Sequence, residues 1–370
     1  MRIRPGNDGD RIMATVFRRR IAGLSIVELM IAITIGLIIL SAITRLFVTS
    51  RSTYTLEEGL ARVQESGRFA MEFLAQDIRM AGYAGCSANL SGGSVANHVS
   101  PASSASNFNP DGVAGYKYTC TGSCSGARTE WTPELPAEYF PTGSVSALTS
   151  TDVIVIQRAD TVSTHLSGNL STNNANIQVF STAGVLSNIQ EGDVLMVSDC
   201  SGADVFKATN VGGGSGTTTI AHSSAGNTSP NLSKTYNTEA EIMKLITRIY
   251  FIGRRDSSAP PSLYRRALAT NASLETQELV EGVEMMRLSY GEDTDATGDK
   301  VPNIYRAPSA VSNWRKVITA RVGLLVKTPG NVEQEADTRT YDLAETTVGP
   351  FNDKVRRRAF NSTIQLRNHF

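Results

Sequence analysis

The stretch that decides the fold is residues 18–48, RRRIAGLSIVELMIAITIGLIILSAITRLFV. Residues 24–48 are almost entirely apolar, and only Glu28 and Arg45 carry a charge there. A helix of roughly 25 residues, rising about 1.5 Å per residue, is long enough to cross the hydrocarbon core of a bilayer. The stretch therefore predicts a transmembrane helix over residues 24–48.

The segment before this helix is polar and basic. Residues 1–23, MRIRPGNDGDRIMATVFRRRIAG, end in three consecutive arginines at 18–20 and a short apolar junction. Such a segment is typical of a targeting leader and not of a folded element. Either Met1 or Met13 would serve as its start. Because arginines are retained on the cytoplasmic side of a membrane, the chain after Arg45 is expected in the periplasm.

The helical pattern continues beyond the apolar stretch. Over residues 49–83, apolar side chains recur at steps of mostly three and four residues, with charged side chains between them. No proline interrupts residues 24–82. We therefore expect one helix over residues 24–83, about 60 residues and roughly 90 Å long, with an amphipathic second half.

The junction between leader and helix has the features of a cleavage site. Gly23 would be the last residue of the leader and Leu24 the first of the mature chain, and glycine offers a peptidase backbone without an obstructing side chain. An ordinary secretory signal loses its apolar region on cleavage, whereas here the apolar region follows the cut. The helix would therefore be kept as an anchor.

Glu28, fifth in the mature chain, lies inside the apolar helix. A carboxylate is costly in a membrane, and by default it indicates a functional partner. Cleavage after Gly23 would create an α-amino group close by in sequence. We expect Glu28 to neutralise the N-terminal amine of a neighbouring subunit in a helix-packed filament, which favours the correct axial register. The alternative is an isolated glutamate that is protonated or lies near the interface.

The rest of the chain predicts a β-rich head, so the expected fold class is α+β. Residues 84–240 are rich in Ser, Thr, Gly and Asn, with short strands between polar loops. Residues 241–370 show more regular strand patterns, and we expect them to form one antiparallel sheet with a solvated face. The clearest strand patterns lie at 152–157, 176–181, 193–199, 246–255, 262–268, 283–291, 318–328 and 362–368.

Composition argues against nucleic-acid binding, and the absence of known motifs argues against an enzyme. Lys plus Arg and Asp plus Glu number 35 each, so no overall charge attracts nucleic acid. The basic run at 356–358 lacks the interleaved aromatic residues that base stacking requires, and we interpret it as a solvated strand edge. The chain has no Gly-x-Ser-x-Gly, Walker or paired-histidine motif, so we expect no enzyme. A membrane-anchored periplasmic enzyme or binding protein with an unfamiliar site is the alternative.

The N-terminal features together resemble a known signal. RRRIAGLSIVELMIAITIGLIIL, residues 18–40, is similar to the class III signal of type IV prepilins and of type II secretion pseudopilins. The resemblance implies that a dedicated prepilin peptidase cuts after Gly23 and N-methylates Leu24. Family members more often begin the mature chain with Phe and Thr, where this chain has Leu24 and Ser25.

Later blocks are similar to PilW-type minor pilins. The resemblance implies a minor pilin of a type IV pilus that joins other minor pilins and the major pilin, primes assembly at or near the filament tip, and supports twitching motility and cell adhesion. A tip adhesin is a further candidate partner. The protein would cross the bacterial inner membrane once, with its head in the periplasm, and later enter the filament. The J-type pseudopilin of type II secretion is the alternative. The similar blocks are residues 64–86, 192–209, 286–305 and 356–368.

Four cysteines favour disulfides formed in an oxidising compartment, here the periplasm. Three pairings are possible. Cys120 and Cys124 can close a small loop, which leaves Cys86, at the end of the long helix, to pair with Cys200 after a predicted strand. This second bridge would fasten the helix end to the head.

An acidic loop lies at residues 293–303, DTDATGDKVPN. Asp293, Asp295 and Asp299 have spacings that resemble the start of a calcium loop, although Ile304 stands where an EF-hand requires Glu. The loop is thus either a calcium site between two strands or a solvated acidic turn without an ion. Apart from this candidate ion, we expect no cofactor.

Overall fold

The computed structural model confirms the α+β class, with one long helix and a β-rich head. It divides into two compact units, Met1–Tyr54 and Thr55–Phe370, which are described separately. The residues described are 23, 25–86, 95–140, 145–181, 189–214, 216–295 and 298–368.

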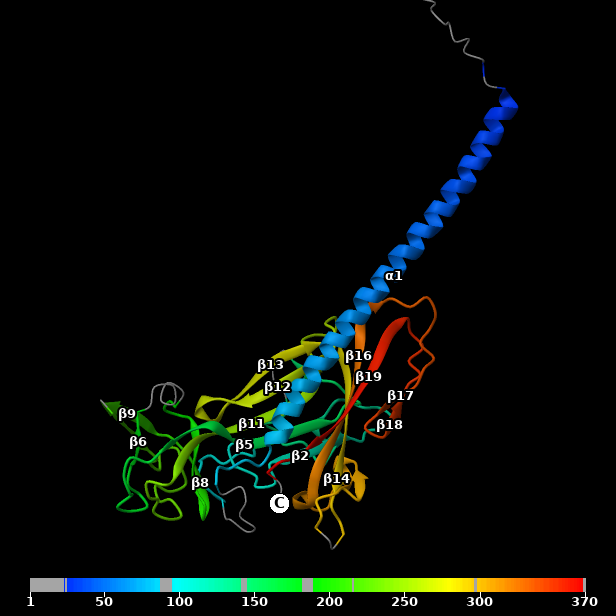
Figure 1. Cartoon of the computed structure of the whole chain (residues 1–370). Coiled ribbons are helices and arrows are strands. Elements are labelled where there is room, and N and C mark those ends of the chain that lie inside the picture. The colour runs from blue at the N-terminus through cyan, green and yellow to red at the C-terminus, as the bar shows by residue number, and fades with distance from the viewer. Residues whose placement is uncertain are drawn as a thin grey trace, which may run out of the picture. The chain divides into compact units, whose positions relative to one another are not determined.

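The long helix α1, Ile26–Met80, contains 55 residues, and the predicted long helix is confirmed (Figure 1). In the first unit, the apolar side chains of residues 26–54 are exposed. In the second unit, α1 buries Val63, Leu74 and Ile78 at helical spacing. After the helix, Gly82 has a φ of 76°, the left-handed conformation that commonly ends helices.

The larger sheet of the head has ten strands, in the order β1-β8-β7-β11-β5-β2-β3, with β12 and β4 also paired to β11 and with β13 paired to β12. Its pairs are antiparallel except for β1 and β8, which are parallel. The strands are β1 Val95–Asn97, β2 Val113–Tyr118, β3 Trp131–Thr132, β4 Ser146–Ala147, β5 Val153–His165, β7 Val194–Asp199, β8 Gly202–Lys207, β11 Glu241–Arg254, β12 Ser262–Leu268 and β13 Leu274–Glu281.

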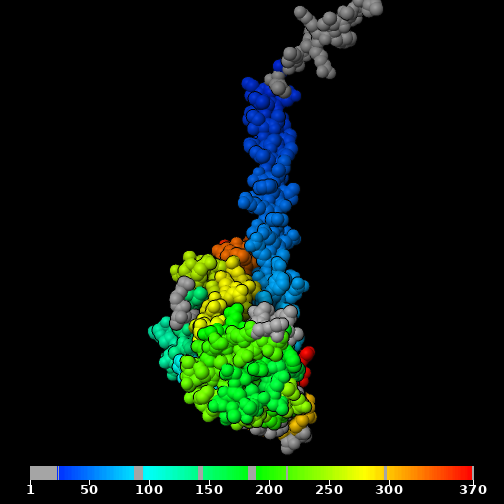
Figure 2. Space-filling view, turned by 90° about the vertical axis from the view of Figure 1, so that its left-hand side faces the viewer, coloured from blue at the N-terminus to red at the C-terminus, as the bar shows by residue number. Residues whose placement is uncertain are grey.

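Three smaller sheets complete the head. They have the orders β15-β14-β16-β19, β6-β10-β9 and β17-β18. Figure 2 shows, in green, the continuous face to which β6, β9 and β10 belong. The strands are β6 Ile177–Phe180, β9 Asn210–Gly214, β10 Thr217–Ala221, β14 Val283–Glu292, β15 Ile304–Arg306, β16 Val317–Asn331, β17 Tyr341–Leu343, β18 Thr346–Val348 and β19 Val355–Gln365. Short 3-10 helices lie at Arg128–Glu130, Thr270–Ala272, Pro308–Ala310 and Trp314–Lys316.

The prediction of a single sheet over residues 241–370 is wrong. Strands β11, β12 and β13 belong to the ten-stranded sheet, and only β14, β15, β16 and β19 form the separate four-stranded sheet. Gly282, with a φ of 88°, joins β13 to β14 where the chain leaves one sheet for the other. The second face of β16 is not simply solvated either, because a Cβ added at Gly323 would lie 2.7 Å from Leu343 and Ala344.

The interpretation of residues 356–358 as a solvated edge is also wrong for Arg357. This side chain is 4 % exposed, and its Nε donates to Glu284 at 2.6 Å while Nη1 donates to Asp353 at 2.6 Å. Successive strand residues point to opposite faces, so Arg358 is exposed while Arg357 is buried.

The largest hydrophobic core of the head lies where α1 meets both major sheets. It joins Leu74 and Ile78 of the helix to Tyr250 of the ten-stranded sheet and to Leu288 and Val322 of the four-stranded sheet. Figure 1 shows the C-terminal part of α1 running along these strands. The helix is therefore an integral part of the head's core from about its middle onward.

Candidate functional site

The first part of α1 has the properties of a membrane anchor. Among the described residues, α1 is the one helix long and apolar enough to cross a membrane, by length and composition. Glu28 lies exposed in its first turn. Gly23 is exposed, and a Cβ added there would meet nothing within 4 Å. Leu24 lies outside the described residues, so cleavage after Gly23, methylation and the role of Glu28 stay predictions.

Two glycines let the second part of α1 approach the sheet closely. A Cβ added at Gly59 would lie 2.9 Å from the Thr328 side chain on β16. At Gly67 it would lie 2.3 Å from the Phe360 ring on β19. Glycine lowers helix propensity by about 1 kcal/mol relative to alanine, so these positions are explained by packing and not by local preference.

Asp77 is a buried charged contact between α1 and the ten-stranded sheet. It is 1 % exposed and accepts hydrogen bonds from Arg248 Nη1 at 2.6 and 2.7 Å and from the Tyr250 hydroxyl at 2.5 Å. Arg158 Nη2 lies 4.0 Å away. Burial, and next the Asp77 charge, raise the pKa of Tyr250 well above its ordinary value. Sequence analysis did not single out Asp77, although an acid between Leu74 and Ile78 on an apolar face was an available signal.

A disulfide fixes the segment that follows α1. Cys86 is bonded to Cys200 over a sequence separation of 114, and Cys120 is bonded to Cys124. This is the pairing that we favoured from the sequence. Beside the long-range bridge, the Ser198 hydroxyl donates to the Ala84 carbonyl at 2.8 Å. The end of the helix is thus joined covalently to the turn between β7 and β8.

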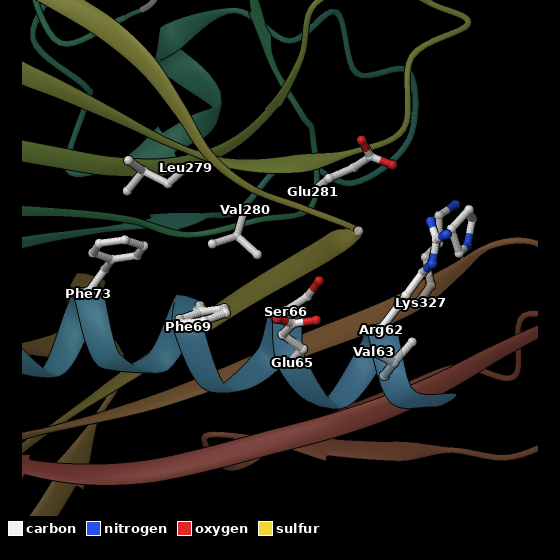
Figure 3. Close-up of a pocket in the computed structure, with 12 residues that line it drawn as sticks. Arg62, Val63, Glu65, Ser66, Phe69, Phe73, Leu279, Val280, Glu281 and Lys327 are labelled. Carbon is white, nitrogen blue, oxygen red and sulfur yellow. The ribbon is translucent and has the colours of Figure 1, made fainter. Parts of the chain in front are cut away.

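A groove of about 550 Å³ lies between α1 and the β13–β14 turn. Figure 3 shows Phe69 and Phe73 beside Leu279 and Val280 in one half, with Arg62 and Lys327 close together in the other. Phe69 is 44 % exposed. The lining is suited to contact with apolar side chains.

A buried polar cluster in the ten-stranded sheet is centred on Asp204 of β8. Its buried carboxylate accepts from His98 at 2.6 Å, from the Ser233 amide and hydroxyl at 2.9 and 2.7 Å, and from the Tyr236 hydroxyl at 2.5 Å. Burial raises the pKa of Asp204, but these hydrogen bonds outweigh it and hold the pKa below its ordinary value. The cluster fastens two loops to β8.

The acidic loop brings its three predicted residues together. One carboxylate oxygen from each of Asp293, Asp295 and Asp299 lies within 4.8 Å of the others. Asp293 accepts from the Lys300 amide at 3.0 Å, and Asn303 donates to Asp295 at 2.9 Å. Residues 296 and 297 lie outside the described residues. Both a calcium site and a solvated acidic turn fit this geometry, so calcium binding stays a prediction.

The comparison with protein families points to pilus assembly. Residues 249–368 match the family model described as Type IV Pilus-assembly protein W. This match supports a PilW-type pilus protein. The PilW-type region runs from within β11 to the residues that follow β19, so it includes Tyr250 and Phe360, which contact α1. No curated protein and no solved structure matches the chain.

Proposed function

We propose that this protein is a minor pilin of a type IV pilus, inserted by α1 in the bacterial inner membrane with its head in the periplasm and later incorporated into the filament. The observation that carries the proposal is a single helix that begins as a membrane-length apolar segment and ends in the core of a head containing the PilW-type region. An apolar segment of this kind can exchange a lipid environment for contacts with the helices of other subunits.

The contacts of the second part of α1 support a role for the helix in holding the head to the membrane anchor under force. Asp77, the Gly67 contact with Phe360 and the Cys86–Cys200 bridge all resist separation of the helix from the head. In the proposed function the head primes assembly at or near the tip with other minor pilins and the major pilin, with a tip adhesin as a further candidate partner. It thereby supports twitching motility and adhesion.

Processing of the leader is the first test. We expect the membrane form to begin at Leu24 with an added methyl group, and Gly23→Val to block cleavage because a prepilin peptidase site would not accept the side chain. Intact-mass analysis of the purified membrane form measures both. A mature protein that begins elsewhere would overturn the prepilin assignment.

Assembly is the second test. Glu28→Ala makes the anchor more apolar, so membrane insertion should persist, while fewer surface pili form because the partner of the N-terminal amine is lost. Glu57→Ala, at an exposed acid on the same helix, is the matched control. Normal piliation in the Glu28 variant would contradict the assembly role. Co-purified partners would separate a pilus from a type II secretion system.

The acidic loop has its own test. If the loop takes up calcium, millimolar calcium should raise the melting temperature of the protein and a chelator should reverse the rise, because a ligand of the folded state stabilises it by mass action. Asp295→Asn should then abolish the shift. An unchanged melting temperature would favour the solvated acidic turn.

A further inference from the structure

Arg266, on strand β12, lines a cavity of about 260 Å³ in the head. The guanidinium is enclosed, since the residue is only 7 % exposed. Much of the remaining lining is apolar, with Phe140, Leu274 and nearby alanines, and Ser103 and Glu138 add polar groups. A buried cationic residue therefore lines a small, largely apolar space.

Arg266 differs from the other two buried arginines of the described chain. Arg158 has Asp77 at 4.0 Å, and Arg357 has Glu284 and Asp353 at 2.6 Å. Within the described residues, no carboxylate lies within 4.0 Å of Arg266. Among the described residues, the Arg266 side chain makes one hydrogen bond, from Nη1 to the Phe140 carbonyl, and its buried Nε, like that of Arg158, has no acceptor there. Burial accordingly lowers the pKa of Arg266, and no neighbouring acid offsets this effect.

A buried charge without a counterion is strongly unfavourable, because no ion pair offsets the free-energy cost of its desolvation. The planar guanidinium matches a carboxylate through two parallel N–H···O bonds, which add strength and geometric selectivity. We propose that this cavity binds a small molecule through a carboxylate group held by Arg266. The carboxylate would supply both the missing charge and an acceptor for the terminal guanidinium N–H groups that reach the cavity.

The lining also defines the rest of the ligand. Glu138, the one acid among the lining residues, accepts from the Ser104 amide at 2.7 Å, and its negative charge disfavours multiply charged anions such as phosphate and sulfate more than a monocarboxylate. Phe140 and Leu274 favour a short apolar body. A short-chain monocarboxylate is therefore the ligand class that fits, and butyrate is a suitable probe.

The test uses the detergent-solubilised full chain and calorimetric titration with sodium butyrate, sodium acetate, sodium phosphate and sodium sulfate at matched ionic strength. We expect butyrate to bind more tightly than acetate, and phosphate and sulfate to give no saturable heat. In Arg266→Met, butyrate affinity should fall at least about tenfold, because both charge-assisted hydrogen bonds are lost. Arg266→Lys keeps the charge but lacks the planar guanidinium, so it should bind butyrate more weakly than the wild type does.

Arg265→Met is the matched control, since Arg265 is the neighbouring strand residue and its Nη2 donates to Gln277 at 2.9 Å. It should retain wild-type butyrate affinity. Thermal unfolding without butyrate checks the fold, and Arg266→Met should melt no lower than the Arg265 control, because a buried unpaired charge has been replaced by an apolar side chain. Absent butyrate binding by the wild type, equal binding by Arg266→Met, or saturable phosphate binding as tight as that of butyrate would overturn the proposal.

Discussion

The two parts of α1 differ in how their apolar side chains are distributed. In residues 26–54 they cover all sides of the helix and are exposed, whereas in residues 55–80 most of them are buried or half-buried against the head, and most charged residues are exposed. A helix that is apolar all round suits a membrane, and a helix with one apolar stripe suits a protein surface. One helix therefore combines a segment that is apolar on all sides with an amphipathic segment, and the change between the two marks where the head begins.

Glycine shows the same contrast at single positions. A Cβ added at Gly36 would meet nothing within 4 Å, whereas one at Gly67 would collide with Phe360. The same residue type thus has a packing role only in the second part of the helix. The contrast predicts that changes at buried positions within residues 55–86 affect the stability of the head and that changes at residues 26–54 do not.

The largest expected effect is the loss of the Cys86–Cys200 bridge behind α1. Replacing both cysteines by serine removes a cross-link over 114 residues and should lower the free energy of unfolding by about 4–5 kcal/mol in the chain-entropy model. The matched control is the Cys120/Cys124 double serine variant. It removes a disulfide between cysteines that are separated by 4 in sequence, and its free energy of unfolding should fall by only about 2 kcal/mol. Urea unfolding measures both. Equal losses in the two variants would contradict the loop-length argument for the Cys86–Cys200 bridge.

The next effect concerns the buried charge of the helix. Asp77→Ala leaves Arg248 and Tyr250 without their acceptor and should lower the free energy of unfolding by about 3–5 kcal/mol. Glu72→Ala, at an exposed acid on the same part of α1, should change it by less than about 0.5 kcal/mol. Chemical unfolding of the two variants compares them. Similar small changes would contradict the importance of the Asp77 contact.

The paired glycines give a direct test of the two parts of α1. Gly67→Ala should destabilise the head by about 1–3 kcal/mol, because the new methyl group forces Phe360 or the helix to move. Gly36→Ala should leave the unfolding of the head unchanged. Thermal unfolding of the detergent-solubilised protein measures the difference. An equal response at both positions would remove the distinction between the two parts.

The smallest effect is expected at acid pH and lies in the head alone. The lowered pKa of Asp204 means that its stabilising contribution is present above the ordinary aspartate value of 3.8 and is lost as the pH falls through the lower, folded value. Asp204→Asn should therefore lose less stability than the wild type on acidification from neutral pH, because the substituted side chain takes up no proton in this range. Urea unfolding across pH 7 to about 3 measures this dependence. An identical pH dependence in both proteins would exclude Asp204 as a source of acid sensitivity.

Strand positions were more predictable than strand partners. The runs at 152–157, 262–268 and 318–328 all lie in strands, because alternating or continuous apolar residues indicate burial within a few positions. The same pattern cannot tell which strands will pair, so residues 241–370 were wrongly expected to form one sheet. Arg357 was misjudged for a related reason, since its partners Glu284 and Asp353 come from a different strand and from a loop.

By itself, the sequence determined the long helix, its change from an apolar to an amphipathic segment, the α+β class and the positions of most of the longer strands. These features depend on residues close together in the chain, whose periodicity and composition are read directly. Only the tertiary structure decided that Gly59 and Gly67 are contact points, that Asp77 meets Arg248, and that Arg266 is buried with no described carboxylate within 4.0 Å. Each of these depends on groups far apart in sequence, and the energy of a buried charge or a close approach is set by neighbours that local sequence does not specify.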